Sequence, residues 1–294
     1  MTFNNKKFLV PEIQKSVFVT EKFSVAETYA EILGVTNKEN GYYENESYII
    51  TWCIGHLVTL AYPEEYSEDM KKWDMDKLPF LPETYRYKVI ESVASQFKII
   101  KKLYHRSDIG AIFYAGDSGR EGIYIQALVR QMAGHNPSAE EYVVWIDSQT
   151  EEEIKKGIEN ALPFSTEKYK RLTDAGYERA IEDYATGINF SRLLTLKYAG
   201  MLNRAAALKK YTPISVGRVM SCVLGMVVNR EREILGFKSI PFYKLKSTIK
   251  VGENLIEAAW KVNEKSRYFD SPKLYSNDGF KEMEDATACI ASLP

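Results

Sequence analysis

The sequence contains few cysteines. Its 294 residues include three, Cys53, Cys222 and Cys289, which lie far apart and form no CxxC pair. This spacing argues against a structural zinc site and against the disulfide framework of a small secreted protein. We therefore expect the chain to work in a reducing, cytoplasmic compartment.

Long hydrophobic runs are also missing. No apolar stretch approaches the roughly 18 residues that suggest a membrane-spanning helix, and the first residues lack the apolar core of a secretion signal. The composition is that of a folded protein, with 45% hydrophobic and 13% aromatic residues. The length allows two domains, and we find no internal repeat and no low-complexity tract.

The net charge is small, −1 at neutral pH, but the charges are unevenly distributed. Residues 192–246 hold eleven Lys or Arg and only two acidic residues, Glu231 and Glu233. This local excess of positive charge fits a phosphate-binding surface. It also fits a solvated helix surface, and charge alone favours this second interpretation.

The hydrophobic pattern predicts an α/β domain up to about residue 160. Strands alternate there with helices, which is typical of a mainly parallel sheet covered on both faces. The expected strands are 16–21, 48–52, 109–115 and 141–146, and the expected helices are 25–33, 87–105 and 121–133, with another helix starting at Thr150. We expect Ser24 to be the N-cap of the first helix and Gly34 to end it.

After about residue 160 the pattern becomes mainly helical. Helical periodicity covers residues 169–195 and 215–234, and an alternating pattern from Phe242 predicts a new β region. The chain stops in a predicted helix at 279–290, so we expect it to be part of a longer protein.

The segment from Asp117 to Glu121, Asp-Ser-Gly-Arg-Glu, follows a predicted buried strand and opens a helix. Open α/β sheets place their functional sites at such strand ends. Asp117 and Glu121 can share one hydrated Mg²⁺, and Arg120 can hold a phosphate oxygen. The alternative is that Asp117 only caps the helix, but the coincidence of glycines, acids and an arginine favours a functional site.

Two other segments carry candidate residues. Glu21 and Lys22 lie at the end of the first predicted strand, where a glutamate beside a lysine can serve as a metal ligand or proton donor, or can form a plain surface ion pair. Ser215 and Gly217 stand at a predicted helix start, which can bind phosphate. His56 follows the strand at 48–52, although a lone histidine is more often structural.

Seven segments resemble, in order, the sequence blocks of type IA DNA topoisomerases, most closely the topoisomerase III branch. They are 17–26 (family pattern xxxxEKPSxA), 51–58 (TWxxGHLV), 73–82 (W…LPxxP), 117–122 (DxGREGE), 145–150 (WISSxT), 174–192 (DA…GxNxSR) and 215–233 (SVGRVQTPVLGLVVxRExE). Any one block would be weak evidence for the family, but seven blocks in the family's order are a specific match. Phe23 departs from the pattern, since the family usually has proline there.

The resemblance implies an α/β TOPRIM fold, which is Rossmann-like with a mainly parallel sheet. A mainly helical DNA-groove domain and the start of a β-containing arch domain would follow. The expected divisions are an N-terminal extension at 1–15, the TOPRIM domain at 16–160, an incomplete helical DNA-binding domain at 161–238 and a truncated arch domain at 239–294.

The resemblance also implies roles for single residues. Glu21 and Lys22 match catalytic residues, the first handling the proton of the 3′-oxygen and the second stabilising phosphate charge. The expected Mg²⁺ ligands are Glu21, Asp117 and Glu121. The residues expected to bind single-stranded DNA are His56, Arg120, Asn189, Arg192, Ser215, Gly217 and Arg218.

Two departures bear on the metal. Gly119 stands where TOPRIM enzymes have a second aspartate, although the glycine variant occurs within the topoisomerase III branch, and Ile123 stands where the family often has another glutamate. Both remove negative charge, so we expect the DNA-free protein to bind Mg²⁺ weakly.

In the family, a tyrosine attacks a phosphodiester of single-stranded DNA and forms a 5′-phosphotyrosyl link. A second strand passes through the break, which is resealed without ATP. None of the 20 tyrosines here lies in the family's TYPRTD-like segment, so the resemblance implies that this chain does not cleave DNA by itself. We expect a monomer without membrane attachment. The full-length enzyme could have a helicase partner, which these residues do not encode.

Other interpretations stay open. The chain could be another TOPRIM enzyme, such as a primase or a nuclease that uses Mg²⁺ directly, although the SVGRV and GxNxSR blocks argue against this. It could be a single-stranded-DNA-binding module without activity, or an α/β metabolic enzyme. Salt-sensitive binding of a single strand would separate the nucleic-acid interpretations from the metabolic one.

Overall fold

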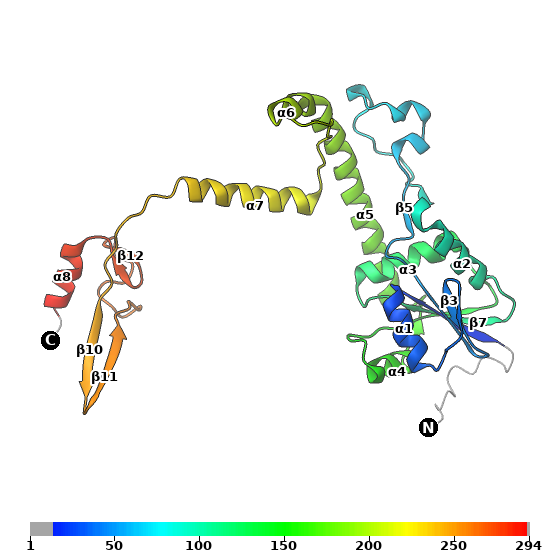
Figure 1. The fold of residues 1–294 in the computed structure, drawn as a ribbon, viewed down its shortest axis with the longest axis horizontal. Helices are drawn as coiled ribbons and strands as arrows, with labels where there is room; N and C mark the ends of the chain where they lie inside the picture. Colours follow the sequence, from blue (N-terminus) through cyan, green and yellow to red (C-terminus); the bar gives the residue numbers. More distant parts are fainter. Residues whose placement is uncertain (1–13, 293–294) are drawn as a thin grey trace. The chain divides into compact units, whose positions relative to one another are not determined.

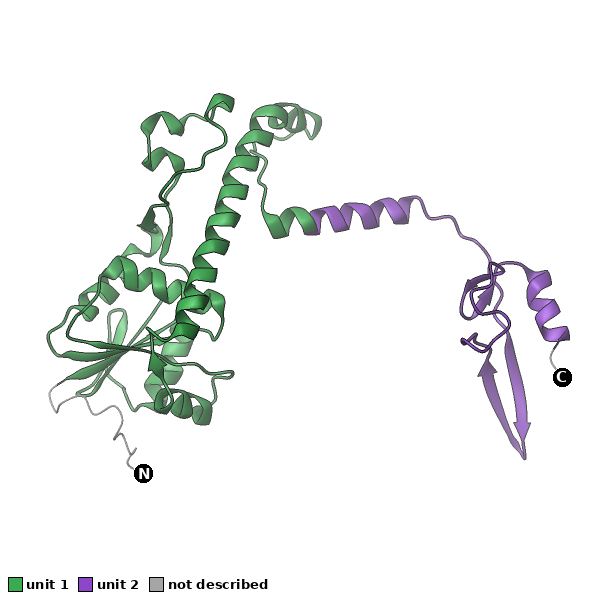
Figure 2. Ribbon diagram, turned by 180° about the vertical axis from the view of Figure 1, so that it is seen from behind, with its two compact units in different colours: residues 1–222 green, residues 223–294 purple. Residues whose placement is uncertain are grey.

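The computed structural model describes residues 14–292 and forms two compact units, residues 1–222 and 223–294 (Figures 1 and 2). The expected N-terminal extension lies almost wholly outside the described residues. The expected domain boundaries near residues 160 and 238 do not coincide with the division between the units, and they stay predictions.

The first unit is built on a seven-stranded sheet (Figure 1). In spatial order its strands are β2 (Lys38–Glu39), β3 (Tyr42–Glu44), β4 (Tyr48–Trp52), β1 (Lys15–Thr20), β7 (Ile109–Ala115), β8 (Glu140–Val143) and β9 (Leu162–Pro163). The four central strands, β4, β1, β7 and β8, are parallel, whereas the edge strands are antiparallel. The predicted mainly parallel sheet is confirmed.

Helices cover both faces of this sheet, because the central strands bury side chains on both sides. α1 (Phe23–Ile32) and α4 (Glu151–Glu159) pack on the face that carries Phe18. α2 (Ala94–Tyr104), α3 (Arg120–Ala133) and the first turns of α5 (Glu167–Leu194) pack on the face that carries Val17 and Val19. Successive residues of β1 therefore belong to two separate hydrophobic cores.

Smaller elements complete the first unit. β5 (Val58–Leu60) and β6 (Tyr87–Val89) pair with each other, and the chain between them forms three short 3₁₀ turns, at 63–65, 68–71 and 75–77. A fourth, at 91–93, precedes α2. A π-helical turn at 195–199 joins α5 to α6 (Gly200–Ala205).

A last helix and small β elements make up the rest of the chain. α7 (Arg218–Leu235) contains the division between the units. The second unit then has the hairpin of β10 (Lys246–Val251) and β11 (Asn254–Ala259), the pair β12 (Leu274–Ser276) and β13 (Gly279–Phe280), and α8 (Met283–Ala291). No helix among the described residues is long and apolar enough to cross a membrane.

Most predicted elements are confirmed, and the errors have local causes. The helix expected over 87–105 was wrong at its start, because residues 87–89 pair with β5 as a strand. Ser24 is not the N-cap, because the helix begins directly after the sheet and Lys22 occupies the cap position. The helix expected over 279–290 begins instead with β13, and α8 starts at Met283. Gly34 does end the first helix, with a φ of 67°.

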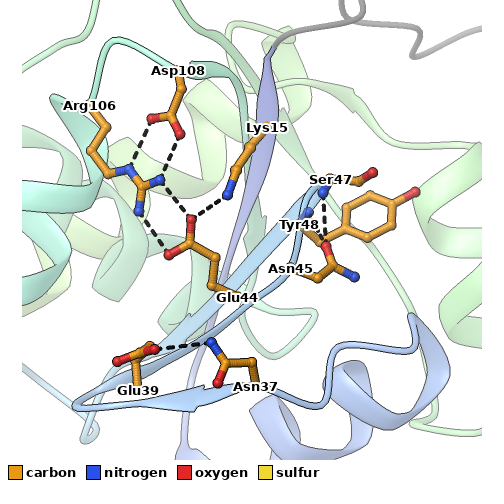
Figure 3. Close-up of polar contacts among 9 residues, drawn as sticks. All are labelled: Lys15, Asn37, Glu39, Glu44, Asn45, Ser47, Tyr48, Arg106 and Asp108. Atoms are coloured by element: carbon orange, nitrogen blue, oxygen red, sulfur yellow. Dashed lines mark hydrogen bonds and ion pairs between the residues drawn. The ribbon is translucent and has the colours of Figure 1, made fainter.

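Opposite charges join three segments at the amino edge of the sheet (Figure 3). The carboxylate of Glu44, on β3, lies 2.5 Å from the Lys15 ammonium group and accepts two hydrogen bonds, of 2.7 and 3.0 Å, from Arg106. Arg106 also contacts Asp108 in two places, at 2.6 and 2.9 Å. Hydrogen bonds first from Arg106 and then from Lys15 lower the pKa of Glu44. This network connects β1, β3 and the start of β7.

Replacing Glu44 should therefore destabilise the fold in a pH-dependent way. At pH 7, Glu44→Gln should lower the free energy of unfolding by about 1–2 kcal/mol, the value of charged hydrogen bonds at a partly exposed site. The pKa of Glu44 in the folded protein lies below the ordinary 4.5. The difference in unfolding free energy between the variant and the parent protein should therefore shrink as the pH falls below 4.5 and through that folded pKa.

Urea unfolding followed by circular dichroism at pH 7 and at acid pH measures this. Glu46→Gln, an exposed carboxylate on the same connection, is the control and should match the parent protein. An equal loss at both pH values would contradict the electrostatic origin.

Candidate active site

The carboxyl ends of β1 and β7 bring two acidic residues together. The strands are adjacent and parallel, and Thr20 pairs with Ala115 at their carboxyl ends. Glu21 and Asp117 therefore follow the last paired residues at the same edge of the sheet. The backbone N–H of Asp117 donates a hydrogen bond of 3.1 Å to the Glu21 carboxylate. The turn after β7 is tight, because a Cβ on Gly122 would lie 2.0 Å from the Asp117 carbonyl oxygen. Only glycine fits at that position.

The environment of Glu21 favours its neutral form. Burial raises its pKa above the ordinary 4.5, and the side chain of Asp117 adds to the effect by hydrogen bonding and by its charge. The Asp117 backbone and Lys22 act in the opposite direction. A protonated carboxyl group at this strand end can donate a proton, and an ionised one can bind a cation.

Glu121 points to a different group of residues. Its carboxylate lies 2.9 Å from His56 Nε2 and 3.8 Å from the guanidinium of Arg179 on α5. The structure therefore pairs Glu21 with Asp117 and pairs Glu121 with basic residues. Among residues 14–292 there is no group of three or more His, Cys, Asp or Glu side chains placed to hold a metal ion.

The charged series continues along α5 to the start of α7. Arg179 lies 3.5 Å from Asp183, which accepts hydrogen bonds of 2.7 and 3.3 Å from Arg218. His56, Glu121, Arg179 and Asp183 line one cavity of about 320 Å³. The sequence analysis missed Arg179 and Asp183, because a pair four residues apart on a helix looks like an ordinary surface ion pair.

Ser215 and Gly217 do not stand inside a helix. α7 begins at Arg218, three residues later than predicted, because the preceding segment runs extended along α5. The Val216 N–H donates a hydrogen bond of 2.8 Å to the Ser191 hydroxyl. The GxNxSR and SVGR blocks are therefore in direct contact, and Arg218 reaches the cavity side of α5.

Two residues expected to bind DNA make internal contacts. The Asn189 side chain hydrogen-bonds to both the N–H and the carbonyl of Phe80, at 2.6 and 3.0 Å. Arg192 is only 4% exposed, donates to the Met70 carbonyl at 3.3 Å and lies 3.5 Å from Glu64. Both side chains hold the segment between β5 and β6 against α5. The DNA-binding role of these two residues stays a prediction. Their internal contacts argue against it.

The exposed candidates are placed differently. Lys22 and Arg120 lie on the surface, each close in sequence to the Glu21–Asp117 pair. At Gly119 an added side chain would meet nothing within 4 Å, so the missing aspartate of the TOPRIM pattern leaves open space.

The carboxylate pair fits one Mg²⁺. This ion is commonly bound by one or two carboxylates while it keeps several water molecules. Burial first, and the Asp117 side chain after it, raise the pKa of Glu21, and a bound cation would favour its ionised form.

Comparisons with known proteins identify the family of both parts of the chain. The Toprim domain model matches residues 16–148, and a DNA topoisomerase model matches residues 167–292. The chain is 35% identical over 261 residues to DNA topoisomerase 3 of Bacillus thuringiensis, which covers 88% of this chain and 33% of that protein.

Two further relatives give the same result. DNA topoisomerase 3 of Staphylococcus aureus is 36% identical over 80% of this chain, and that of Bacillus subtilis is 34% identical over 81%. This chain spans about a third of the length of these relatives. It contains a Toprim domain and belongs to the type IA DNA topoisomerases, within the topoisomerase III branch.

Proposed function

We propose that this chain forms the part of a topoisomerase III that holds a single DNA strand across the carboxyl edge of the Toprim sheet. In this proposal it also transfers a proton to the 3′-oxygen that leaves during strand cleavage. The observation that carries the proposal is the contact between Glu21 and Asp117 at the ends of two parallel strands. Arg179 lines the adjoining cavity, and Arg218 contacts Asp183 of its lining; both arginines suit a DNA backbone.

Glu21 is the proposed proton donor. Its raised pKa keeps a larger share of the carboxyl group protonated near neutral pH than an exposed glutamate would have. Lys22, beside it, would stabilise negative charge on the phosphate. A Mg²⁺ ion held by Asp117, and by Glu21 once its proton has been transferred, would neutralise phosphate charge and orient the DNA backbone.

Arg179 and Arg218 are the proposed contacts for the DNA backbone, together with Arg120 near the strand end. A guanidinium group binds phosphate oxygens through two parallel hydrogen bonds. In the absence of DNA, Arg218 makes the same kind of contact with the carboxylate of Asp183. His56, which lines the cavity, would face the same strand.

The helical segment containing α5 to α7 would be the DNA-groove domain, and the β elements after residue 238 would begin the arch domain. No tyrosine of this chain has the sequence context of the family's nucleophile. For the isolated chain, the second candidate function is therefore single-strand binding without cleavage.

Removing Arg218 should weaken DNA binding and make it less salt-sensitive. For Arg218→Ala we expect a smaller slope of log affinity against log salt, by about 0.7 for one lost phosphate contact on a single strand. Fluorescence anisotropy with a labelled oligothymidylate between about 50 and 200 mM salt measures this.

The matched control is Arg171→Ala, an exposed arginine of α5 that pairs with Glu167 one helical turn away. It should leave the slope unchanged. If the parent chain bound the strand with no salt dependence, or did not bind it, the proposed function would be refuted.

The isolated chain should form no covalent link to DNA, because it lacks a tyrosine in the nucleophile context. A 3′-labelled single strand is incubated with the chain and Mg²⁺, denatured with detergent and separated on a gel, with a full-length topoisomerase 3 as the positive control. A protein-linked label would contradict this expectation. Nicking without a link would instead favour the nuclease interpretation.

Glu21→Gln should stabilise the metal-free protein at pH 7. A carboxyl group whose folded pKa is raised destabilises the fold once it ionises, and glutamine removes that cost. The gain should vanish well below pH 4.5, where Glu21 is protonated in both the folded and the unfolded chain. Urea unfolding with a chelator present measures it, with exposed Glu27→Gln as control. A less stable Glu21→Gln protein at pH 7 would contradict the assigned environment.

A further inference from the structure

A second cavity lies at the carboxyl edge of the sheet, beside the Glu21–Asp117 pair. Its volume is about 330 Å³, which leaves room for an ion and several water molecules at about 30 Å³ each. The polar residues that line it are Tyr29, Asp117, Ser118, Asp147, Ser148 and Gln149. They come from α1, from the turn after β7 and from the segment between β8 and α4.

The cavity lies where the sheet topology favours a ligand. From β1 the chain crosses to α1 on one face of the sheet, whereas from the adjacent β7 it crosses to α3 on the other face. The helices therefore diverge between these two strands, and open α/β sheets bind their ligands in the crevice formed there.

The lining of the cavity suits a hard cation. Its lining residues include two aspartates, Asp117 and Asp147, together with serine, tyrosine and glutamine residues, and none of them is Lys, Arg or His. Divalent cations such as Mg²⁺ and Mn²⁺ are bound by such oxygen ligands and do not need a third carboxylate. An anion would find no compensating charge.

A buried hydroxyl group gives independent support. Tyr29 is 1% exposed and lines the cavity, and its hydroxyl has no hydrogen-bond partner among the described residues. Buried polar groups are nearly always hydrogen-bonded, so an orphan of this kind calls for a ligand or a bound water. Burial also raises the pKa of Tyr29, so that the phenol stays a neutral donor.

The sequence has an additional acidic residue in this lining. The segment 145–150 resembles the family pattern WISSxT, but Asp147 replaces the first serine. This replacement adds one carboxylate after β8.

We propose that Asp117 and Asp147 bind a divalent cation in this cavity, and that the Tyr29 hydroxyl donates a hydrogen bond to a water molecule on that ion. This ion is additional to the one proposed at Glu21 and Asp117. The inference rests on the proposed function in one respect, since Asp117 belongs to both sites.

Binding of Mn²⁺ to the DNA-free 294-residue chain tests the proposal. Electron paramagnetic resonance of free Mn²⁺, titrated to millimolar concentration, gives the number of bound ions. We expect two ions for the parent chain, one for Asp147→Asn and one for Glu21→Gln. Asp76→Asn, which removes an exposed aspartate outside the cavity, should keep two.

Tyr29→Phe separates a ligand role from a structural one. It should weaken binding of the second ion about tenfold, as losses of groups that orient metal ligands do. The melting temperature should stay the same or rise, because the variant removes a buried hydroxyl without a partner. Unchanged Mn²⁺ affinity in Tyr29→Phe would refute its part in the site.

Three other results would overturn the second site. They are two ions bound by Asp147→Asn, loss of both ions in Glu21→Gln, and a parent chain that binds fewer than two ions. One ion bound by the parent chain and lost only in Glu21→Gln would leave the proposed function intact. Failure of the proposed function is separate, since it appears as a lack of salt-dependent DNA binding.

Discussion

The parallel pairing of β1 with β7 is the constraint on which the site depends. It brings Glu21 and Asp117 together although they are 96 residues apart in the chain. A slip of one residue in this pairing would move Val17 and Val19 into the core that holds Phe18, and Phe18 into theirs. Burial on both faces therefore sets the register, and the register sets the approach of the two carboxylates.

The two edges of the sheet have opposite effects on the ionisation of a glutamate. At the amino edge, Glu44 is surrounded by Lys15 and Arg106, so its ionised form is stabilised. At the carboxyl edge, Glu21 is partly buried beside another carboxylate, and its ionised form is destabilised. Functional sites commonly tolerate such local instability, and the rest of the fold compensates for it.

Helix α5 connects the Toprim sheet with the segments that follow it. Arg179 and Asp183 link Glu121, at the start of α3, to Arg218, at the start of α7. Asn189, farther along the helix, holds the segment between β5 and β6. α5 thus lines a charged cavity with Arg179 and Asp183 and makes a structural contact farther along with Asn189. A DNA phosphate that engaged Arg218 would have to replace the carboxylate of Asp183.

The sequence by itself determined the family, the strands at 48–52 and 109–115 and the turn at Asp117, because periodicity and turn residues are local properties. The tertiary structure decided which face each polar side chain meets. It joined Glu121 to His56 and Arg179 rather than to Asp117, buried Arg192, and made residues 87–89 a strand. These outcomes depend on partners distant in the chain, whose positions follow from packing and not from local pattern.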